Sequence, residues 1–178
     1  MKKIIQDLEF ELFISEENIS NRVKVLGDQI TRDFQNKELL VIGVLTGAAF
    51  FLSDLVRVIN LPVDIHFIKL KSYEGLESTG KIQIDIPLPL EIAGRNVLIV
   101  EDIVDTGITM DYLLTEIYKQ FPASVSIATL LHKLEAFQFN YDLNYVGFEI
   151  PNNFIVGYGL DYNEKGRNFP DIYQLCTP

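Results

Sequence analysis

The sequence predicts an α/β protein with a mainly parallel, twisted sheet flanked by helices. Two continuous apolar runs of strand length, LLVIGVL (39–45) and VLIVE (97–101), are typical of strands that are buried on both faces. A third apolar run, SVSIATLL (124–131), has the same character. Segments with helical periodicity separate these runs, as the crossover connections between parallel strands require. The alternation therefore predicts right-handed βαβ units.

Each remaining element has a signal of its own. Apolar residues at positions 19, 23, 26 and 30 predict a first helix, and Ser15 is suited to cap its N-terminus. Thr46-Gly47 then interrupts the first apolar run. The other predicted elements, in chain order, are a helix over 48–59, strands over 63–70 and 81–86, a helix over 110–120, and short strands over 145–150 and 154–160.

Composition restricts the class of protein. A chain of 178 residues with 48% hydrophobic residues is long enough for a full core, and we expect residues 1–178 to form a single domain. The net charge of −10 argues against nucleic-acid binding, which depends on clustered Lys and Arg. Cys176 is the only cysteine, so no disulfide forms within the chain. No apolar window suits a signal peptide or a membrane span, and these features predict a cytoplasmic protein without a membrane partner.

The strand VLIVE leads into an unusual group of polar residues, EDIVDTGIT (101–109). In open α/β sheets, ligands bind outside the carboxyl ends of the strands, where we expect Glu101 and Asp102 to lie. Backbone N–H groups at the start of the next helix, with two threonine hydroxyls, would form a cradle for a phosphate, and Gly107 permits close approach. The paired acids suit a diol or Mg²⁺. An acidic loop followed by a capped helix is the simpler alternative for any two of these residues.

EDIVDTGIT resembles the motif with which type I phosphoribosyltransferases bind phosphoribosyl pyrophosphate (PRPP). Within that group, the whole chain resembles the hypoxanthine-guanine phosphoribosyltransferases. LTG (45–47) resembles their pyrophosphate loop, KSYEGLESTG (71–80) their flexible lid, and LLHK (130–133) with residues 146–167 their purine-binding region and C-terminal hood. The resemblance implies the type I phosphoribosyltransferase fold, with a small hood formed by N- and C-terminal segments.

The resemblance implies a role for each matching residue. Glu101 and Asp102 would contact the ribose hydroxyls, directly or through Mg²⁺, and Asp105 would exchange a proton with N7 of the purine. The full set is Asp105, Thr106, Gly107, Ile108 and Thr109 for the 5′-phosphate; Lys133, Phe154, Ile155 and Asp161 for the purine; Thr46, Gly47 and Arg167 for pyrophosphate; Ser72 and Tyr73 for the lid; and Glu101, Asp102 and Asp161 for Mg²⁺. Taken one by one, Lys133 and Phe154 would be read as a solvated lysine and a core ring. His66 and His132 are interpreted as structural.

The chain departs from the family pattern at Thr46, where the family usually has Lys or Arg. A cation is therefore missing from that corner of the site, although the backbone N–H can still bind pyrophosphate. The resemblance also implies a cis peptide between Leu45 and Thr46.

The activity implied is Mg²⁺-dependent transfer of the 5-phosphoribosyl group from PRPP to a 6-oxopurine, by a homodimer or homotetramer. A PRPP-sensing regulator that binds nucleic acid is one alternative, which the acidic balance disfavours. A phosphate-binding module without catalysis is another, but it would need neither a lid nor a purine site. Adenine and orotate transferases are the nearest enzymatic alternatives. Lys133 argues against adenine, because the 6-amino group of adenine is a donor, as is the lysine.

Overall fold

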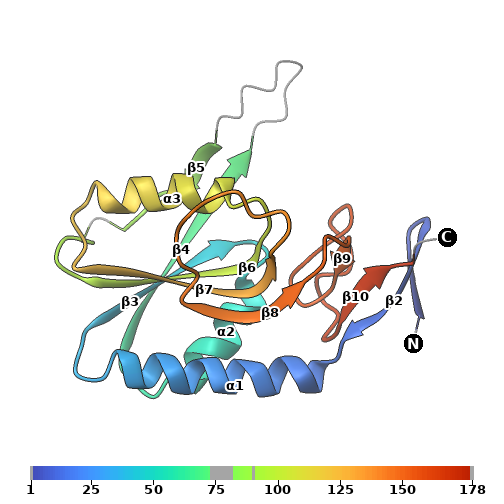
Figure 1. The fold of residues 1–178 in the computed structure, drawn as a ribbon, viewed down its shortest axis with the longest axis horizontal. Coiled ribbons are helices and arrows are strands. Elements are labelled where there is room, and N and C mark those ends of the chain that lie inside the picture. Colours follow the sequence, from blue (N-terminus) through green and yellow to red (C-terminus); the bar gives the residue numbers. More distant parts are fainter. Residues whose placement is uncertain (1, 73–81, 90, 177–178) are drawn as a thin grey trace.

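The computed structural model describes residues 2–72, 82–89 and 91–176, and its largest layer is a six-stranded sheet. The strands lie in the order β5-β4-β3-β6-β7-β8 (Figure 1). Their bounds are β3 Leu39–Leu45, β4 Val63–Ser72, β5 Ile82–Ile86, β6 Asn96–Val104, β7 Ser124–Lys133 and β8 Tyr145–Ile150. Five strands are parallel and β5 is antiparallel to β4, so the predicted mainly parallel sheet is confirmed.

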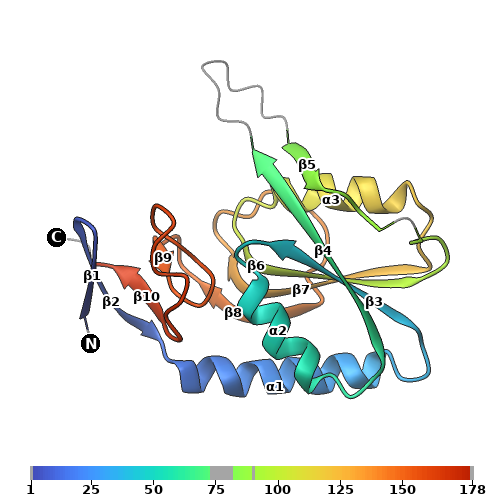
Figure 2. The same ribbon diagram turned by 180° about the vertical axis from the view of Figure 1, so that it is seen from behind.

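Helices cover both faces of this sheet (Figures 1 and 2). Helices α1 (Glu16–Asp33) and α2 (Ala49–Val58) pack together on one face, and α3 (Ile108–Tyr118) covers the other. Ser15 caps α1 as predicted, since its hydroxyl accepts a hydrogen bond from the N–H of Asn18 at 3.3 Å. Apolar residues of the sheet pack against both helix layers, which gives one core cluster on each face. No helix in the described part of the chain is long and apolar enough to cross a membrane.

The predicted hood is a second, antiparallel sheet beside the carboxyl ends of the main strands (Figure 1). It contains β1 (Lys2–Ile5), β2 (Leu8–Ile14), β10 (Ile172–Leu175) and β9 (Ile155–Val156), in that order. A small apolar cluster, formed by Ile5, Phe10, Val156 and Tyr173, joins the two ends of the chain. The strand predicted over 154–160 is only two residues long, because residues 157–159 all have positive φ and turn the chain away.

Three strands are longer than predicted: β4, which reaches Ser72, and β6 and β7. We expected the strand VLIVE to end at the acidic pair, but β6 continues to Val104, and Glu101 and Asp102 therefore lie within it. The cause is pairing with β7, which continues past the acids through Ile103↔Leu131 and Val104↔His132. Strand β7 in turn reaches Lys133, two residues beyond the apolar run. Backbone pairing, rather than the change from apolar to polar side chains, sets where these strands end.

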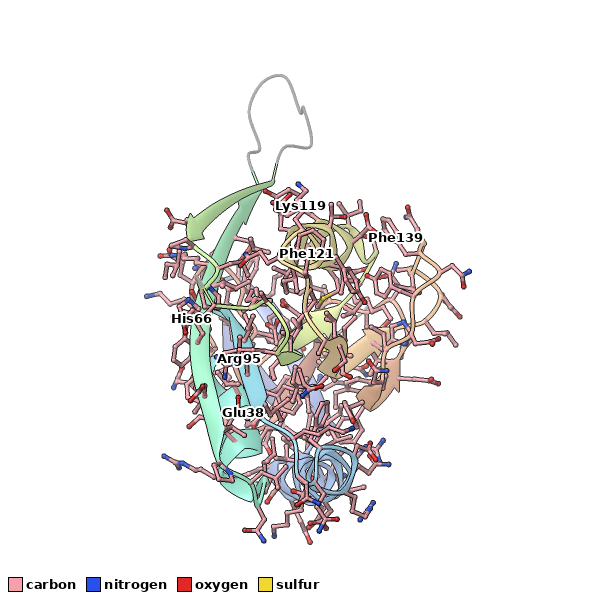
Figure 3. All side chains as sticks on the ribbon, turned by 90° about the vertical axis from the view of Figure 1, so that its left-hand side faces the viewer. Glu38, His66, Arg95, Lys119, Phe121 and Phe139 are labelled. Atoms are coloured by element: carbon pink, nitrogen blue, oxygen red, sulfur yellow. The ribbon has the colours of Figure 1, made fainter. Side chains whose placement is uncertain are left out.

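Figure 3 views the opposite edge of the sheet, at the amino ends of the strands, where Glu38 and Arg95 lie. Arg95 forms an ion pair with Asp64, and the side-chain amide of Asn96 donates to the carbonyl of Glu38 at 3.0 Å. The predicted site residues 101–109 and Lys133 lie at the other edge, at the carboxyl ends of β6 and β7.

Candidate active site

The predicted phosphate loop, residues 105–109, connects β6 to α3 and lines a cavity of about 250 Å³ with Glu101. Gly107 precedes the helix with a φ of 88°, a conformation that favours glycine, and its carbonyl accepts from the N–H of Asp111 at 2.9 Å. No side chain caps this helix end. The first N–H groups of a helix have no partner within it, so they are available here to an anion. The loop has the geometry of a phosphate cradle.

An aromatic segment, residues 137–141, packs against this loop and supports it; we call this segment the brace. The hydroxyl of Tyr141 donates to the carbonyl of Gly107 at 2.9 Å, and the N–H of Gln138 donates to the carbonyl of Thr106 at 3.1 Å. A Cβ on Gly107 would lie 2.8 Å from both the Phe137 ring and the Tyr141 hydroxyl, so only glycine fits. The aromatic run FQFNY is the sequence signal for this segment, but its contact with Gly107 depends on the tertiary fold.

The acidic pair is enclosed. Atom Oε2 of Glu101 is buried and has no hydrogen-bond partner among the described residues. Burial, and then the negative charge of Asp102, raise the pKa of Glu101 well above its ordinary value. Burial also raises the pKa of Asp102, while hydrogen bonds and the positive charge of Arg167 act in the opposite direction. A buried carboxylate oxygen without a partner is costly for the protein alone and suits a site that is completed by a ligand.

The predicted pyrophosphate loop, residues 45–47, lies directly against Asp102. A Cβ on Gly47 would be 1.8 Å from Oδ2 of Asp102. Only glycine therefore allows the backbone at position 47 to come this close to the Asp102 carboxylate. The Leu45–Thr46 peptide is cis, as expected. Thr46 itself is exposed.

Lys133 and Asp105 meet at the same edge. The Lys133 ammonium lies 2.9 Å from Oδ2 of Asp105, and the two side chains are 12% and 46% exposed. A lysine ammonium has three donors, so this contact leaves donors for a ligand. The structure thus joins the residue predicted to exchange a proton with the purine to the residue predicted to bind its 6-oxo group.

Two of the three other predicted purine residues, Phe154 and Ile155, lie at the hood sheet. Phe154 is 46% exposed, and its ring packs beside the rings of Phe10 and Tyr162, with centroids 6.2 and 5.9 Å away. The carbonyl of Phe154 accepts from the N–H of Leu175 at 2.9 Å. Ile155 is buried in β9. Phe154 therefore has the free ring area that stacking on a base requires.

Asp161 and Arg167 form an ion pair, with Nη2 of Arg167 2.7 Å from Oδ1 of Asp161. Nη1 of Arg167 also donates to the carbonyl of Gly159 at 2.6 Å. A Cβ on Gly159 would lie 2.0 Å from the carbonyl oxygen of Gly47, so this part of the hood packs backbone to backbone against the pyrophosphate loop. Within the predicted lid, Ser72 is the last residue of β4, and Tyr73 lies outside the described residues.

The carboxylates Glu101 and Asp102 suit Mg²⁺, which completes its coordination with water and substrate oxygens, better than they suit a metal that is coordinated by protein side chains alone. No three Asp, Glu, His or Cys side chains converge in the described part of the chain. Mg²⁺ usually takes only one or two carboxylates, together with water and substrate oxygens. The unpartnered oxygen of Glu101, next to Asp102, provides this kind of incomplete site. The two histidines make structural contacts: the ring of His132 meets that of Phe137 edge-on at 5.2 Å, and His66 Nε2 lies 3.1 Å from the carbonyl oxygen of Pro87.

Fold and site together define a phosphoribosyltransferase domain, and the family model of that name matches residues 15–163. A hypoxanthine-guanine phosphoribosyltransferase of Staphylococcus aureus strain Mu50 is 42% identical over 166 residues, which is 93% of each chain. That of Aquifex aeolicus is 38% identical and covers 97% of this chain and 98% of its own. The crystal structure of a hypoxanthine phosphoribosyltransferase from S. aureus superposes with a TM-score of 0.88 at 42% identity, covering 93% of this chain and 91% of that one. The chain belongs to the hypoxanthine-guanine phosphoribosyltransferase family.

Proposed function

We propose that this protein is a purine-salvage transferase that joins a 6-oxopurine to PRPP and releases pyrophosphate. The substrates are hypoxanthine, guanine or xanthine, and the products are the corresponding nucleoside 5′-monophosphates. One observation carries the proposal: the loop 105–109 lines a cavity of about 250 Å³ and contains Asp105, which forms an ion pair with Lys133. A phosphate cradle and a purine-reading lysine at one sheet edge match a reaction between a phosphorylated sugar and a base. Residues 1–178 are taken as one domain.

Each part of the site has a task in this proposal. Residues 105–109 bind the 5′-phosphate, while Glu101 and Asp102 face the ribose hydroxyls. Lys133 donates to the purine 6-oxo group, Phe154 stacks on the ring, and Ile155 offers its backbone carbonyl to the edge of the base. Thr46, Gly47 and Arg167 bind pyrophosphate, and Ser72 and Tyr73 belong to the closing lid. These assignments are supported by the contacts among the described residues and by the order of the motifs.

The chemistry follows from this arrangement. Displacement at the anomeric carbon passes through an oxocarbenium-like state, and Asp105 accepts or returns the proton at N7 of the purine. Residues that hold the base and the sugar phosphate in line lower the entropic cost of the reaction. Glu101 and Asp102 are the proposed protein ligands of one Mg²⁺, and Asp161 is the proposed ligand of a second. When bound, Mg²⁺ acts as a Lewis acid toward the departing pyrophosphate.

The setting of the enzyme is proposed together with its reaction. We take it to be cytoplasmic, because its substrates are intracellular metabolites, and to form a homodimer or homotetramer, as its family resemblance implies. Nucleic acid and membranes have no part in this proposal.

A panel of purines tests the function. The purified protein is incubated with PRPP, Mg²⁺ and hypoxanthine, guanine, xanthine or adenine, and nucleotide products are separated by chromatography. We expect a monophosphate from at least one 6-oxopurine, none from adenine, and loss of turnover when Mg²⁺ is chelated. Absence of turnover with all three 6-oxopurines would refute the proposal. Binding of RNA or DNA that weakens with salt would favour the regulatory alternative instead.

A further inference from the structure

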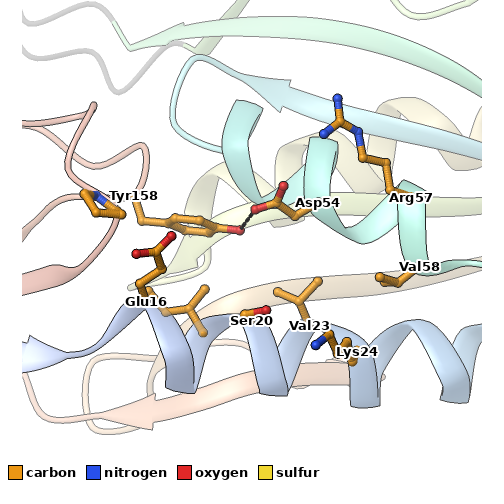
Figure 4. A pocket seen from close by; sticks show the side chains of 10 residues that line it. Glu16, Ser20, Val23, Lys24, Asp54, Arg57, Val58 and Tyr158 are labelled. Carbon is orange, nitrogen blue, oxygen red and sulfur yellow. Dashed lines mark hydrogen bonds between the residues drawn. The ribbon is translucent and has the colours of Figure 1, made fainter.

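Tyr158 connects the hood to the main sheet layer through a contact that the proposed reaction does not use. Its hydroxyl donates to Oδ2 of Asp54 on α2 at 2.6 Å, and Figure 4 shows the ring extending from the hood toward that helix. The side chain is 7% exposed, and the ring of Phe50 lies 6.3 Å away. Burial and the Asp54 carboxylate raise the pKa of Tyr158, so the hydroxyl keeps its proton and remains a donor.

The backbone around Tyr158 has an unusual conformation. Gly157, Tyr158 and Gly159 have φ values of 110°, 48° and 103°. A bulky residue such as tyrosine is rarely found in the left-handed region, and such conformations persist only where the surroundings hold them. Two backbone hydrogen bonds do so from the hood side, from the N–H of Tyr158 to Phe169 and from that of Gly159 to Arg167. The hydroxyl bond to Asp54 adds an anchor on the core side.

This turn touches the pyrophosphate loop. Gly159 packs so closely on Gly47 that an added Cβ would lie 2.0 Å from the Gly47 carbonyl oxygen, and the Gly159 carbonyl accepts from Arg167 at 2.6 Å. Helix α2, which carries Asp54, follows the pyrophosphate loop after Ala48. The Tyr158–Asp54 bond therefore ties the hood turn to the helix that continues the same loop.

The Tyr158–Asp54 hydrogen bond lies beside a cavity, so few neighbouring atoms pack against it on that side. The cavity, of about 310 Å³, lies between α1 and α2, and its lining includes Glu16, Lys24, Arg57 and Tyr158 (Figure 4). The pair bridges the edge of this space, so packing on that side cannot replace the hydroxyl if it is lost.

We propose that Tyr158 and Asp54 are a positioning pair that holds the hood turn on the pyrophosphate loop, so that PRPP and pyrophosphate bind a pre-assembled corner. The inference rests on the proposed function and extends it to two residues that touch no reacting atom. The pair acts through Gly159 and Arg167. Base binding is independent of it, since Phe154 is held by Phe10 and Leu175 within the hood sheet.

The test compares two Tyr→Phe variants. Tyr158→Phe removes the hydroxyl and keeps the ring. Tyr145→Phe is the matched control, because the Tyr145 hydroxyl also donates to a carboxylate, Asp33, at 2.8 Å, but from the amino end of β8, at the edge of the sheet away from the site. Binding of pyrophosphate with Mg²⁺ is measured by calorimetry, and KM for PRPP and for the purine by steady-state kinetics.

For Tyr158→Phe, we expect Kd for pyrophosphate and KM for PRPP to rise about fivefold or more, with the purine KM changed less than about twofold. Tyr145→Phe should leave all three values within about twofold of wild type. Asp54→Asn, which keeps an acceptor, should weaken pyrophosphate binding less than Asp54→Ala.

Two results would overturn the positioning role. One is a Tyr158→Phe variant with unchanged pyrophosphate and PRPP constants, and the other is a parallel rise in the purine KM, which would indicate general loosening of the hood. The calorimetric measurement does not depend on turnover. A wild-type protein that binds pyrophosphate but turns over no 6-oxopurine would refute the proposed function and still test the pair.

Discussion

Asp105 lies between the proposed phosphate loop and Lys133, the proposed purine-binding residue. It lines the 250 Å³ cavity, and its carboxylate is 2.9 Å from the Lys133 ammonium. The Asp105 carboxylate is thus held next to the Lys133 ammonium, while its side chain stays 46% exposed and accessible to a purine base. Such a placement suits a proton-transfer group better than a purely structural acid.

Asp105→Asn should lower kcat by about 10²–10⁴-fold and change KM for PRPP far less, because asparagine keeps the shape but cannot accept the proton. Steady-state kinetics with hypoxanthine or guanine measures both constants. Asp142→Asn, at an exposed position in a nearby segment, is the control. A near-normal kcat would rule out the proton-transfer role.

Substitution of Thr46 is expected to have a small effect on pyrophosphate affinity, and substitution of Gly47 a large one. The Thr46 side chain is exposed, so Thr46→Ala should change pyrophosphate affinity by less than about tenfold, or 1.4 kcal/mol. Gly47→Ala places a Cβ 1.8 Å from Oδ2 of Asp102 and should remove most of that affinity. Calorimetry with pyrophosphate and Mg²⁺ compares them. A large loss in Thr46→Ala would mean that its side chain makes the contact.

Glu101 should make the ligand-free protein less stable as the pH rises. Its pKa is 4.5 in the unfolded chain and well above that in the fold, so below pH 4.5 the group is protonated in both states and carries no penalty. Above pH 4.5 only the unfolded chain ionises freely, and stability is lost until the pH passes the folded-state pKa.

Glu101→Gln should therefore stabilise the ligand-free protein at pH 8 by about 1–2 kcal/mol, which raises Tm by roughly 2–8 °C, with little effect near pH 4. Thermal unfolding at both pH values checks this, and Glu91→Gln, at an exposed carboxylate, serves as the control. Equal Tm values at pH 8 would show that the carboxyl carries no such penalty.

At the scale of elements, the proposed phosphate loop is supported by a segment that contains no predicted ligand-binding residue. Residues 137–141 follow β7 and support the loop between β6 and α3 through the Tyr141–Gly107 bond and the Gln138–Thr106 bond. Strand, loop, helix and brace together set the direction of the N–H groups that face the cavity.

Tyr141→Phe should raise KM for PRPP about three- to tenfold and leave the purine KM nearly unchanged, because a loosened Gly107 carbonyl lets the cradle move. Tyr118→Phe is the control, since Tyr118 is 56% exposed at the far end of α3. If both constants stay at their wild-type values, the loop holds its shape without this bond.

At the scale of the whole molecule, exposed apolar residues lie on the face that α1 and α2 share. Ile65 and Phe67 on β4 are 46% and 42% exposed, and Phe50 on α2 is 46% exposed. Ile65 pairs with the core residue Val41, and Phe67, two residues on, points to the same face. Single exposed apolar residues are ordinary, but a group of them suits an interface.

We expect light scattering on a sizing column to give a mass two or four times the chain mass of 20.3 kDa. Phe67→Lys should shift the protein toward the monomer, because it places a charge in the apolar group. Phe121→Lys, at a residue 81% exposed beyond the end of α3, should leave the mass unchanged. A monomeric wild-type protein would disprove the expected assembly.

The order of elements and the main site motif were readable from the sequence because both depend on local patterns. Apolar runs of strand length predicted β3, β6 and β7, and the helical stripe after Ser15 predicted α1. EDIVDTGIT holds its strand end, loop and helix start within nine consecutive residues, so its chemistry was visible without a fold.

The contacts between distant segments were decided only by the tertiary structure. Pairing with β7 carried β6 past its acids, the brace at 137–141 closed on Gly107, and Tyr158 reached Asp54 over a separation of 104 residues. The sequence likewise gave no sign that one oxygen of Glu101 would be buried without a partner. The physical reason is that burial and hydrogen bonding depend on which atoms the fold brings together, whereas periodicity and motif spacing are properties of neighbouring residues.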